Sequence, residues 1–328
     1  MKESDIRPAD LFQKYLDMSA ADAEAYFGAS ERIDIFCPAC ENAKSTSAFD
    51  KWGFHYLTCY ECNTLYQSPR PPQADCSRFY QDSPSSRYWA QTFFPTVAEA
   101  RREKLFKPKV EEIANLCKKD NFVPNVIADI GAGYGLLLEE WRRRFPETHT
   151  IAIEPNLDMA AICRSKNIEV FECFAEEAKG LYGKVDLIVG LEIIEHVHDP
   201  FLFVTRLKKL MKTGGHILLT GLTIDGFDIQ VLWEKSKSIS PPHHINFMSV
   251  KGFEILFSRA GFKNIQVFTP GKLDVDIVKN TTRDIPGILD NNRFIKTLLG
   301  RQQETSAAFQ KFLSENQLSS HCWIWAEK

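Results

Sequence analysis

One stretch near the middle of the chain decides the fold, and it reads Ile127-Ala-Asp-Ile-Gly131-Ala-Gly133-Tyr-Gly135-Leu-Leu-Leu-Glu-Glu-Trp141. An apolar strand runs into three alternating glycines, and an amphipathic helix follows. Glycine permits a tight turn and lets backbone N–H groups approach a ligand at a helix N-terminus. Leu136 stands where a dinucleotide-binding G-x-G-x-x-G loop would carry its third glycine, which disfavours NAD. By itself, the loop is also compatible with a tight turn that binds nothing.

Around this stretch, short apolar strands alternate with amphipathic helices, which is typical of a parallel sheet covered by helices. We expect strands at 126–130, 150–154, 168–173, 185–190, 216–221 and 262–269, and helices at 136–145, 157–166, 200–211 and 250–260. The aromatic run His321 to Ala326 predicts a closing antiparallel strand. Residues 271–318 then form a helical insertion, and long insertions often act as lids. The predicted fold class is α/β.

Four of the nine cysteines form two Cys-x-x-Cys pairs, Cys37-Pro-Ala-Cys40 and Cys59-Tyr-Glu-Cys62. Their spacing is typical of a zinc ribbon, in which four thiolates hold a structural metal ion. Aromatic residues around the pairs could stack nucleic-acid bases, but packing around a small metal fold is the better interpretation.

The prolines of Ser68-Pro69-Arg70-Pro71-Pro72 predict a stiff, extended connection and a domain boundary. We therefore expect three parts. Residues 1–70 hold N-terminal helices and the ribbon, 71–105 form a helical segment on the substrate side, and 106–328 form the main domain.

Composition excludes several classes of protein. The chain has 328 residues, 44% hydrophobic and 25% charged, which is ordinary for a globular protein. It shows neither a membrane-length apolar run nor a signal peptide or lipid anchor, so the expected location is the cytoplasm. The net charge of −3 provides no basic field for nucleic acid, although a local patch stays open. The oligomeric state is open.

Two acidic residues flank the glycine loop. Asp129 ends the first strand and can accept a hydrogen bond from an ammonium group, and Glu154 ends the next strand and can accept from both hydroxyls of a ribose. With these acids, the loop resembles that of the class I S-adenosylmethionine-dependent methyltransferases, which have a seven-stranded Rossmann-like sheet.

That resemblance covers roughly residues 106–270 and the closing strand, and it implies S-adenosylmethionine as the cofactor. It implies that Asp129 faces the amine of the cofactor and that Glu154 binds its ribose. Phe174 stands where an Asp near the adenine is frequent, so any hydrogen bond to the adenine amine must come from elsewhere. The further implied cofactor-binding residues are Gly131, Ala132, Gly133, Tyr134, Gly135, Pro155, Phe174, Ala175 and Leu191.

The segment Leu191-Glu192-Ile-Ile-Glu195-His196-Val-His198-Asp199-Pro200 follows the fourth strand. It resembles the Glu-x-x-Glu-His pattern of ubiquinone-biosynthesis O-methyltransferases and of small-RNA 2′-O-methyltransferases. This resemblance implies a second divalent site for Mg²⁺ or Mn²⁺ on Glu192, Glu195 and His196.

Without a metal, Glu195 or one of the histidines His196, His243 and His244 could act in catalysis, because imidazole titrates near working pH. A structural role for these residues is the remaining alternative.

A four-cysteine ribbon before such a domain is similar to bacterial methyltransferases linked to sugar nucleotides and surface polysaccharides. The leading prediction is O-methylation of a hydroxyl on a small molecule, a glycan or a sugar nucleotide. The alternatives are RNA 2′-O-methylation and a catalytically inactive, methyltransferase-like adaptor. Methylation at carbon is disfavoured, because the sugar C-methyltransferases that the ribbon resembles carry a further C-terminal domain.

Overall fold

The computed structural model describes residues 2–328, and its main feature is a seven-stranded sheet. The strand order is β10-β11-β8-β7-β4-β5-β6, and only β11 runs antiparallel to its neighbours. The predicted α/β class and the predicted closing strand are confirmed. The strands are β4 (Val126–Ile130), β5 (His149–Ile153), β6 (Glu169–Phe171), β7 (Val185–Gly190), β8 (Met211–Leu222), β10 (Lys263–Phe268) and β11 (His321–Glu327).

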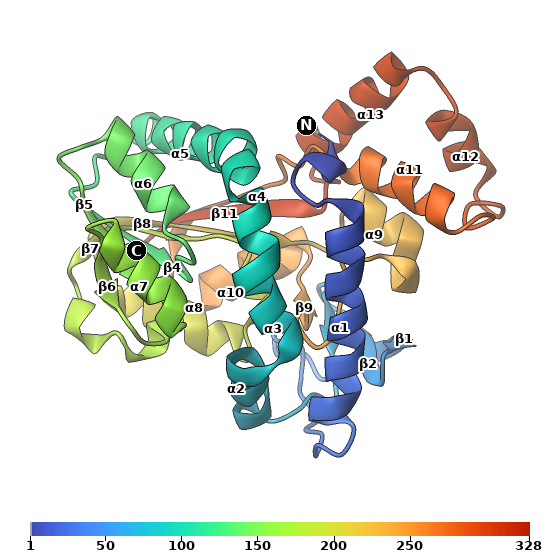
Figure 1. Cartoon of the computed structure of the whole chain (residues 1–328), viewed down its shortest axis with the longest axis horizontal. Coiled ribbons are helices and arrows are strands. Elements are labelled where there is room, and N and C mark those ends of the chain that lie inside the picture. The colour runs from blue at the N-terminus through green and yellow to red at the C-terminus, as the bar shows by residue number, and fades with distance from the viewer. Residues whose placement is uncertain (1) are drawn as a thin grey trace.

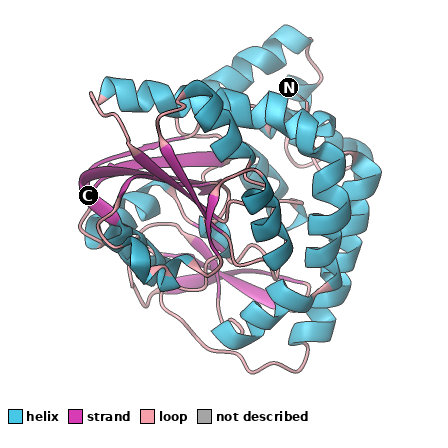
Figure 2. Ribbon diagram, turned by 60° about the vertical axis from the view of Figure 1, so that its left-hand side comes forward, coloured by secondary structure: helices cyan, strands magenta, loops and turns pink. Residues whose placement is uncertain are grey.

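Helices cover both faces of this sheet (Figures 1 and 2). Side chains alternate along each strand, so Ile127 of β4 packs on one face and Ala128 on the other. The first face is covered by α5 (Lys107–Lys119), α6 (Leu136–Arg144) and α7 (Leu157–Ser165). The second face is covered by α8 (Pro200–Leu210) and α10 (Val250–Arg259). Short 3-10 turns lie between these elements: η4 (Ala175–Glu177), η5 (Lys179–Leu181) and η6 (Ile194–His196).

The cysteine-rich segment forms a second, four-stranded sheet in the order β1-β2-β3-β9. Its strands are β1 (Ser45–Lys51), β2 (Phe54–Cys59), β3 (Leu65–Gln67) and β9 (Asn246–Phe247). The fourth strand comes from the far end of the sequence, and Tyr66 of β3 pairs antiparallel with Asn246 of β9. The sequence predicted no strand at 246–247, because a two-residue strand carries no periodicity.

A long N-terminal helix, α1 (Ala9–Phe27), packs against both the ribbon and the helices that follow it. Its C-terminal end packs on the ribbon, where the Phe27 and Phe54 ring centroids are 5.6 Å apart. Its N-terminal half packs beside α3 and α4 (Figure 1). This helical segment consists of α2 (Gln73–Asp82), α3 (Pro84–Tyr88), α4 (Phe94–Arg101) and two π-helical turns, η2 (Trp89–Phe93) and η3 (Arg102–Phe106).

Three helices lie between β10 and β11, namely α11 (Asp274–Asp284), α12 (Arg293–Leu299) and α13 (Gln303–Glu315). They share a core with α9 (Phe227–Leu232), which the turn η7 (Trp233–Lys235) follows. They also hold the N-terminus, because the Glu3 N–H donates to Asp276 at 2.8 Å and Asn280 Nδ2 donates to the Glu3 carboxylate at 2.8 Å. Glu3 opens the turn η1 (Glu3–Asp5). Among residues 2–328, no helix has both the length and the apolar character that crossing a membrane would require.

The ribbon and the main sheet are fastened together by Arg70, which is 1% exposed. Its guanidinium donates to the Gln67 carbonyl at 3.1 Å, to the His198 carbonyl at 2.7 Å and to Asn246 Oδ1 at 3.0 Å. Burial lowers the pKa of Arg70 to about 10, so the side chain stays charged at neutral pH. One planar cation therefore ties the end of β3 to the loop after β7 and to β9.

We expect Arg70→Ala to lower the free energy of unfolding by about 3 kcal/mol or more, because buried acceptors would lose their donors. Arg70→Lys should restore little, since an ammonium group cannot reproduce the planar fork. The exposed Arg78→Ala is the control and should leave the urea midpoint nearly unchanged. Equal midpoints for the Arg70 and Arg78 variants would show that Arg70 does not hold the two sheets together.

Candidate active site

The glycines after β4 give the loop a shape that other side chains would block. Gly131, Gly133 and Gly135 have φ values of 66°, 54° and 66°, in the left-handed region that glycine enters without strain. A Cβ on Gly135 would lie 2.9 Å from Ile168 Cδ1. A Cβ on Gly133 would meet no atom within 4 Å. The backbone at Gly133 is therefore open to close approach by a ligand.

Two buried carboxyl groups stand beside this loop. Asp129 is 4% exposed and Glu154 is 5% exposed. Glu154 accepts hydrogen bonds from the N–H groups of Gly133 and Asn156, at 2.8 Å and 2.9 Å. Burial raises the pKa of both carboxyls, and the charge of Glu154 raises that of Asp129 further. A ligand that brings an amine to Asp129 and hydroxyls to Glu154 would stabilise their ionised forms.

The other predicted cofactor residues surround the same loop to different degrees. Tyr134 stacks on Phe94 of α4 with ring centroids 4.7 Å apart, so the substrate-side helices contact the loop directly. Phe174 is 40% exposed and Ala175 is 5% exposed. Pro155 is exposed, Leu191 is half-buried and Ala132 is buried.

Histidines from two loops meet beside the ends of β7 and β9. His196 lies in η6, His244 precedes β9, and their ring centroids are 4.7 Å apart. One potential ligand atom from each of Glu195, His196 and His244 lies within 4.8 Å of the others. Glu195 is 1% exposed, and its Oε2 has no hydrogen-bond partner among the described residues. These three side chains form the cluster that we call the histidine–glutamate trio.

Hydrogen bonds fix which nitrogen of each ring in the trio carries the proton. The Tyr80 hydroxyl donates to the His243 carbonyl at 3.2 Å, so it accepts from His196 Nδ1 at 3.1 Å. The Ser238 carbonyl can only accept, and His244 Nδ1 donates to it at 2.5 Å. In a neutral imidazole the other nitrogen is then unprotonated. Both rings therefore offer an Nε2 lone pair.

Burial also sets the charge of the trio. It lowers the pKa of His196 well below the usual value, with a further contribution from His244. Burial lowers the pKa of His244 to about 4. It raises the pKa of Glu195 well above its usual value, and the nearby charge of Glu192 adds to this effect. At neutral pH the imidazoles are therefore uncharged, and burial favours the protonated form of Glu195 more than that of a free carboxyl.

Two residues predicted to belong to this cluster are not part of the trio, although the His243 ring centroid is 6.4 Å from that of His196. His243 is 4% exposed, its Nε2 is 3.4 Å from Ser19 Oγ, and its ring packs 4.8 Å from Phe79. Glu192 accepts from Thr220 Oγ1 at 2.6 Å and pairs with His321 at 3.1 Å. The structure thus groups Glu195 and His196 with His244, whereas the sequence predicted Glu192 as the third member. The reason is that residue 192 adopts a φ of 52°, and its carboxylate interacts with Thr220 of β8 and His321 of β11.

Sequence reasoning missed three residues that shape the site. Tyr80 binds His196, His321 pairs with Glu192, and Lys109 Nζ lies 3.6 Å from the Glu192 carboxylate. Tyr80 and Lys109 stand in no motif, and His321 is marked only as the first residue of the predicted closing strand. Their position depends on how α2, α5 and β11 pack, which no local pattern reports.

The four cysteines lie together as predicted, with each potential ligand sulfur within 4.8 Å of the others. The sulfurs of Cys37 and Cys62 are 3.5 Å apart, as are those of Cys40 and Cys59. A tetrahedral zinc site with bonds of about 2.3 Å needs sulfurs roughly 3.8 Å apart, so this cluster fits the ion.

The ribbon also shapes the loop that carries His244. The Tyr56 hydroxyl donates to the His244 carbonyl at 2.7 Å, and the Gln67 N–H donates to the Ile245 carbonyl at 2.9 Å. On the other side of this loop, the Ile245 N–H donates to the Glu195 carbonyl at 2.9 Å. The backbone of the trio is therefore held between the cysteine sheet and the turn after β7.

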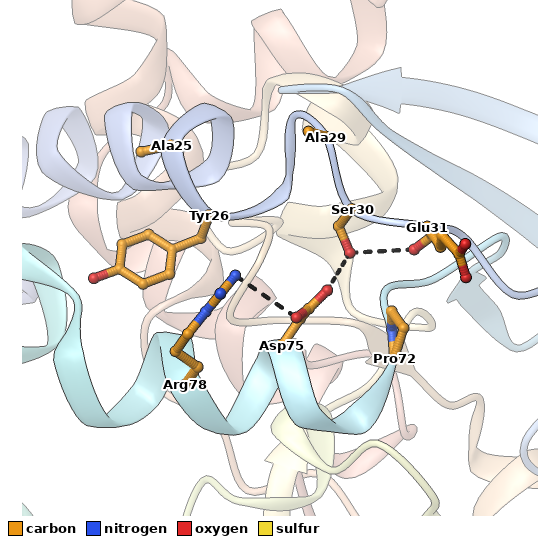
Figure 3. Close-up of a pocket in the computed structure, with 8 residues that line it drawn as sticks. All are labelled: Ala25, Tyr26, Ala29, Ser30, Glu31, Pro72, Asp75 and Arg78. Atoms are coloured by element: carbon orange, nitrogen blue, oxygen red, sulfur yellow. Dashed lines mark hydrogen bonds and ion pairs between the residues drawn. The ribbon is translucent and has the colours of Figure 1, made fainter.

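A surface hollow of about 450 Å³ lies elsewhere, between the end of α1 and α2 (Figure 3). In this hollow, Arg78 and Asp75 of α2 form an ion pair at 3.6 Å, and the Ser30 hydroxyl donates a hydrogen bond to the same carboxylate. Neither the glycine loop nor the trio lines this hollow, so its shape says nothing about the chemistry of the site.

Comparison with known proteins identifies the family. A family model described as a methyltransferase domain matches residues 98–267, just over half of the chain. The chain belongs to this methyltransferase family. The match contains the glycine loop, both flanking acids, Glu195 and His196.

Individual relatives agree with this family. A ubiquinone biosynthesis O-methyltransferase from Bartonella tribocorum is 27% identical over 183 residues, covering 50% of this chain and 73% of the relative. A tRNA U34 carboxymethyltransferase from Alteromonas mediterranea is 25% identical over 119 residues, covering 35% of this chain and 36% of the relative. Among solved structures, a SAM-dependent methyltransferase from Archaeoglobus fulgidus shares the fold, with a TM-score of 0.50, 17% identity, and coverage of 73% of this chain and 100% of that one.

The protein is therefore an S-adenosylmethionine-dependent methyltransferase, and its glycine loop offers the features that this cofactor needs. Asp129, Glu154 and the open backbone at Gly133 could hold the amine, the ribose and the methionine part of the cofactor. The methyltransferase sheet brings the loop and the trio to the same carboxyl edge, where open α/β folds bind ligands.

We expect Gly133→Ala to weaken binding of S-adenosylhomocysteine at least about 10-fold, because the added methyl group would occupy the space that the ligand needs. Gly183→Ala is a matched control, since Gly183 also has a positive φ of 67° and open space at the Cβ position. Both changes should cost a similar 1–2 kcal/mol or so of backbone strain. Calorimetric titration in which both variants bind equally well would remove the loop from the cofactor site.

We also expect one zinc ion per chain, measured by elemental analysis of protein purified without chelator. Cys59→Ser should lose the ion, because structural zinc needs all four thiolates. Cys76→Ser, outside the cluster, should keep it. A folded wild-type protein that contains no metal would contradict the assignment.

Proposed function

We propose that this methyltransferase transfers a methyl group to a hydroxyl of a small-molecule or glycan-linked acceptor, with His196 or His244 as the general base. The observation that carries the proposal is the pair of neutral imidazoles, each with an unprotonated Nε2, at the same carboxyl edge of the sheet as the glycine loop. A hydroxyl must lose its proton as it is methylated, and a neutral imidazole accepts a proton at working pH.

Each part of the site has a separate task in this proposal. When bound, S-adenosylmethionine supplies an electrophilic methyl group. The loop from Gly131 to Gly135, with Asp129 and Glu154, would orient that donor. The aromatic residues of α1 and of the 71–105 segment would cover the acceptor and exclude water. Alignment of the two reactants can supply much of the rate enhancement.

The trio would accept the proton that the acceptor hydroxyl loses. Nε2 of His196 or His244 would take it from the acceptor, while Tyr80 and the Ser238 carbonyl hold the Nδ1 protons in place. Glu195 is a weaker candidate for the base, because burial and the charge of Glu192 raise the pKa of its carboxyl and so favour its protonated form. It could instead stabilise the imidazolium once that forms. The Bartonella relative is named as an O-methyltransferase, which supports oxygen as the acceptor atom.

A divalent metal ion on the trio is the second candidate mechanism. Two imidazole nitrogens and one carboxylate oxygen form a common donor set, and the Oε2 of Glu195 lacks a partner that an ion would supply. Two nitrogen ligands suit Mn²⁺ better than Mg²⁺, which prefers oxygen. In this version the metal would polarise the hydroxyl of the acceptor.

Nucleic acid stays an alternative acceptor, because one relative is named for a tRNA reaction. The net charge of −3 favours a small molecule. The inactive-adaptor alternative is set aside, because the protein is a methyltransferase with an intact glycine loop. We also propose that 1–70, 71–105 and 106–328 are the domains, with 1–70 and 106–328 joined through β3 and β9.

We expect His196→Ala and His244→Ala to reduce turnover by about 100- to 10,000-fold for whichever ring is the base, with unchanged affinity for S-adenosylhomocysteine. His149→Ala, on the surface, is the control. In the wild type, kcat/KM should stay level as the pH falls through 6.5 and decline only nearer pH 4. The reason is that a base with a lowered pKa stays unprotonated to lower pH.

Turnover is measured with radiolabelled cofactor on sugar nucleotides and on RNA ends, and the substrate that the wild type methylates gives the class of acceptor.

Brief chelation that spares the ribbon zinc separates the two mechanisms. Activity that vanishes on chelation and returns with Mn²⁺ would assign a metal ion to the trio. Full activity in both alanine variants would show that the trio is structural.

A further inference from the structure

Two arginines near the trio have no acidic partner. Arg7 precedes α1 and Arg101 ends α4, and both are partly buried. The Nε atom of each is buried without a hydrogen-bond partner, and no carboxylate of the described residues lies within 4 Å of either guanidinium. The next residue, Arg102, contrasts with them, because it binds Glu139 at 2.8 Å and Glu140 at 2.5 Å.

Aromatic rings hold the two guanidiniums in place. Arg7 lies 5.2 Å from the ring centroid of Phe12, and Arg101 lies 5.9 Å from Trp89 and 5.4 Å from Phe94. Phe93 connects the two sides, since its ring is 6.2 Å from Phe12 and 4.5 Å from Trp89. Stacked guanidiniums keep their N–H edges available for an anion.

The same rings place Arg101 between the two halves of the site. Phe94, under Arg101, stacks on Tyr134 of the glycine loop. Trp89, also under Arg101, packs 4.9 Å from Tyr15, which in turn lies 5.5 Å from His243. An anionic group bound by Arg101 would therefore belong to a molecule that lies between the cofactor loop and the histidines.

The nearby acids are already engaged. Asp5 binds Lys104 at 2.8 Å, and Glu192 is shared by His321, Thr220 and Lys109. Burial, with a smaller contribution from the charge of Arg7, lowers the pKa of Arg101 to about 10. Arg101 nevertheless stays cationic at neutral pH, and no carboxylate of the described residues lies within 4 Å of either guanidinium to pair with it.

We propose that Arg7 and Arg101 bind a phosphate group of the methyl acceptor, so that the acceptor is a phosphorylated molecule such as a nucleoside diphosphate derivative. Guanidinium groups recognise phosphate oxygens through paired, charge-assisted hydrogen bonds. This inference rests on the proposed function, because it takes the region between Arg7, Arg101 and the trio, which we call the cleft, as the acceptor site. It adds the charge of the acceptor, which the trio does not specify.

The helical insertion acquires a role in this arrangement. The Arg7 N–H donates to the Glu3 carbonyl at 2.9 Å, and Glu3 is held by Asp276 and Asn280 of α11. Helix α11 thus fixes the segment that carries Arg7 over the cleft.

Titration calorimetry of inorganic pyrophosphate into the zinc-loaded full-length protein, saturated with S-adenosylhomocysteine, tests the proposal. We expect measurable binding in the wild type and a loss of about 10- to 100-fold in Arg7→Ala and in Arg101→Ala. Arg301→Ala, exposed on the insertion, should bind like the wild type. Succinate, a dicarboxylate, should bind more weakly than pyrophosphate.

Three results would overturn the proposal. The first is no pyrophosphate binding by the wild type, and the second is tighter binding of succinate than of pyrophosphate. The third is an Arg101→Ala variant that loses affinity for S-adenosylhomocysteine instead of pyrophosphate, which would assign the guanidinium to the carboxylate of the cofactor. His196→Ala separates this inference from the proposed catalytic role, because it should bind pyrophosphate normally even if its turnover is lost. Normal turnover in His196→Ala and His244→Ala would contradict the base assignment while leaving the pyrophosphate result intact.

Discussion

The pairing of β3 with β9 is the constraint on which the rest of the site depends. Strand β9 starts two residues after His244, and the edge of the cysteine sheet holds it through backbone hydrogen bonds. Arg70 adds three hydrogen bonds across the same junction. The four-cysteine module that carries β2 and β3 therefore also determines where the loop with His244 lies. This gives the ribbon a role inside the catalytic domain, in addition to any docking surface it provides.

Low solvent access acts in opposite ways on the two sets of basic residues in the cleft. It lowers the pKa values of His196 and His244 far enough to keep them neutral, which makes their nitrogens available to a proton or a metal ion. Arg101 stays charged under the same burial, because the pKa of guanidinium starts several units higher. The cleft thus combines uncharged bases with permanent cations. That combination suits an anionic acceptor whose hydroxyl must lose a proton.

Segments far apart in the chain must assemble before this cleft exists. Residues 7–19 supply Arg7, Phe12, Tyr15 and Ser19, residues 80–101 supply Tyr80, Trp89 and Arg101, and α11 anchors the N-terminus. Only the cofactor loop is built from neighbouring residues. In our proposal the acceptor side can therefore change with the packing of α1 while the donor side stays the same, and the family model matches residues 98–267, which contain the donor side but not α1.

The sequence alone determined the strand–glycine–helix unit, the βα alternation and the four-cysteine cluster, because each depends on spacing within one short segment. Strand 126–130 and strand 185–190 were predicted to the residue. Tertiary structure decided which residues meet in the cleft. Glu192 and Glu195 are three apart in sequence, yet the αL conformation of residue 192 sends its carboxylate to His321, while Glu195 meets His244 from another loop. His243 and His244 are adjacent in sequence, yet the His243 ring packs against α1 and the His244 ring belongs to the trio. Such choices follow from long-range packing and burial, which no local pattern encodes.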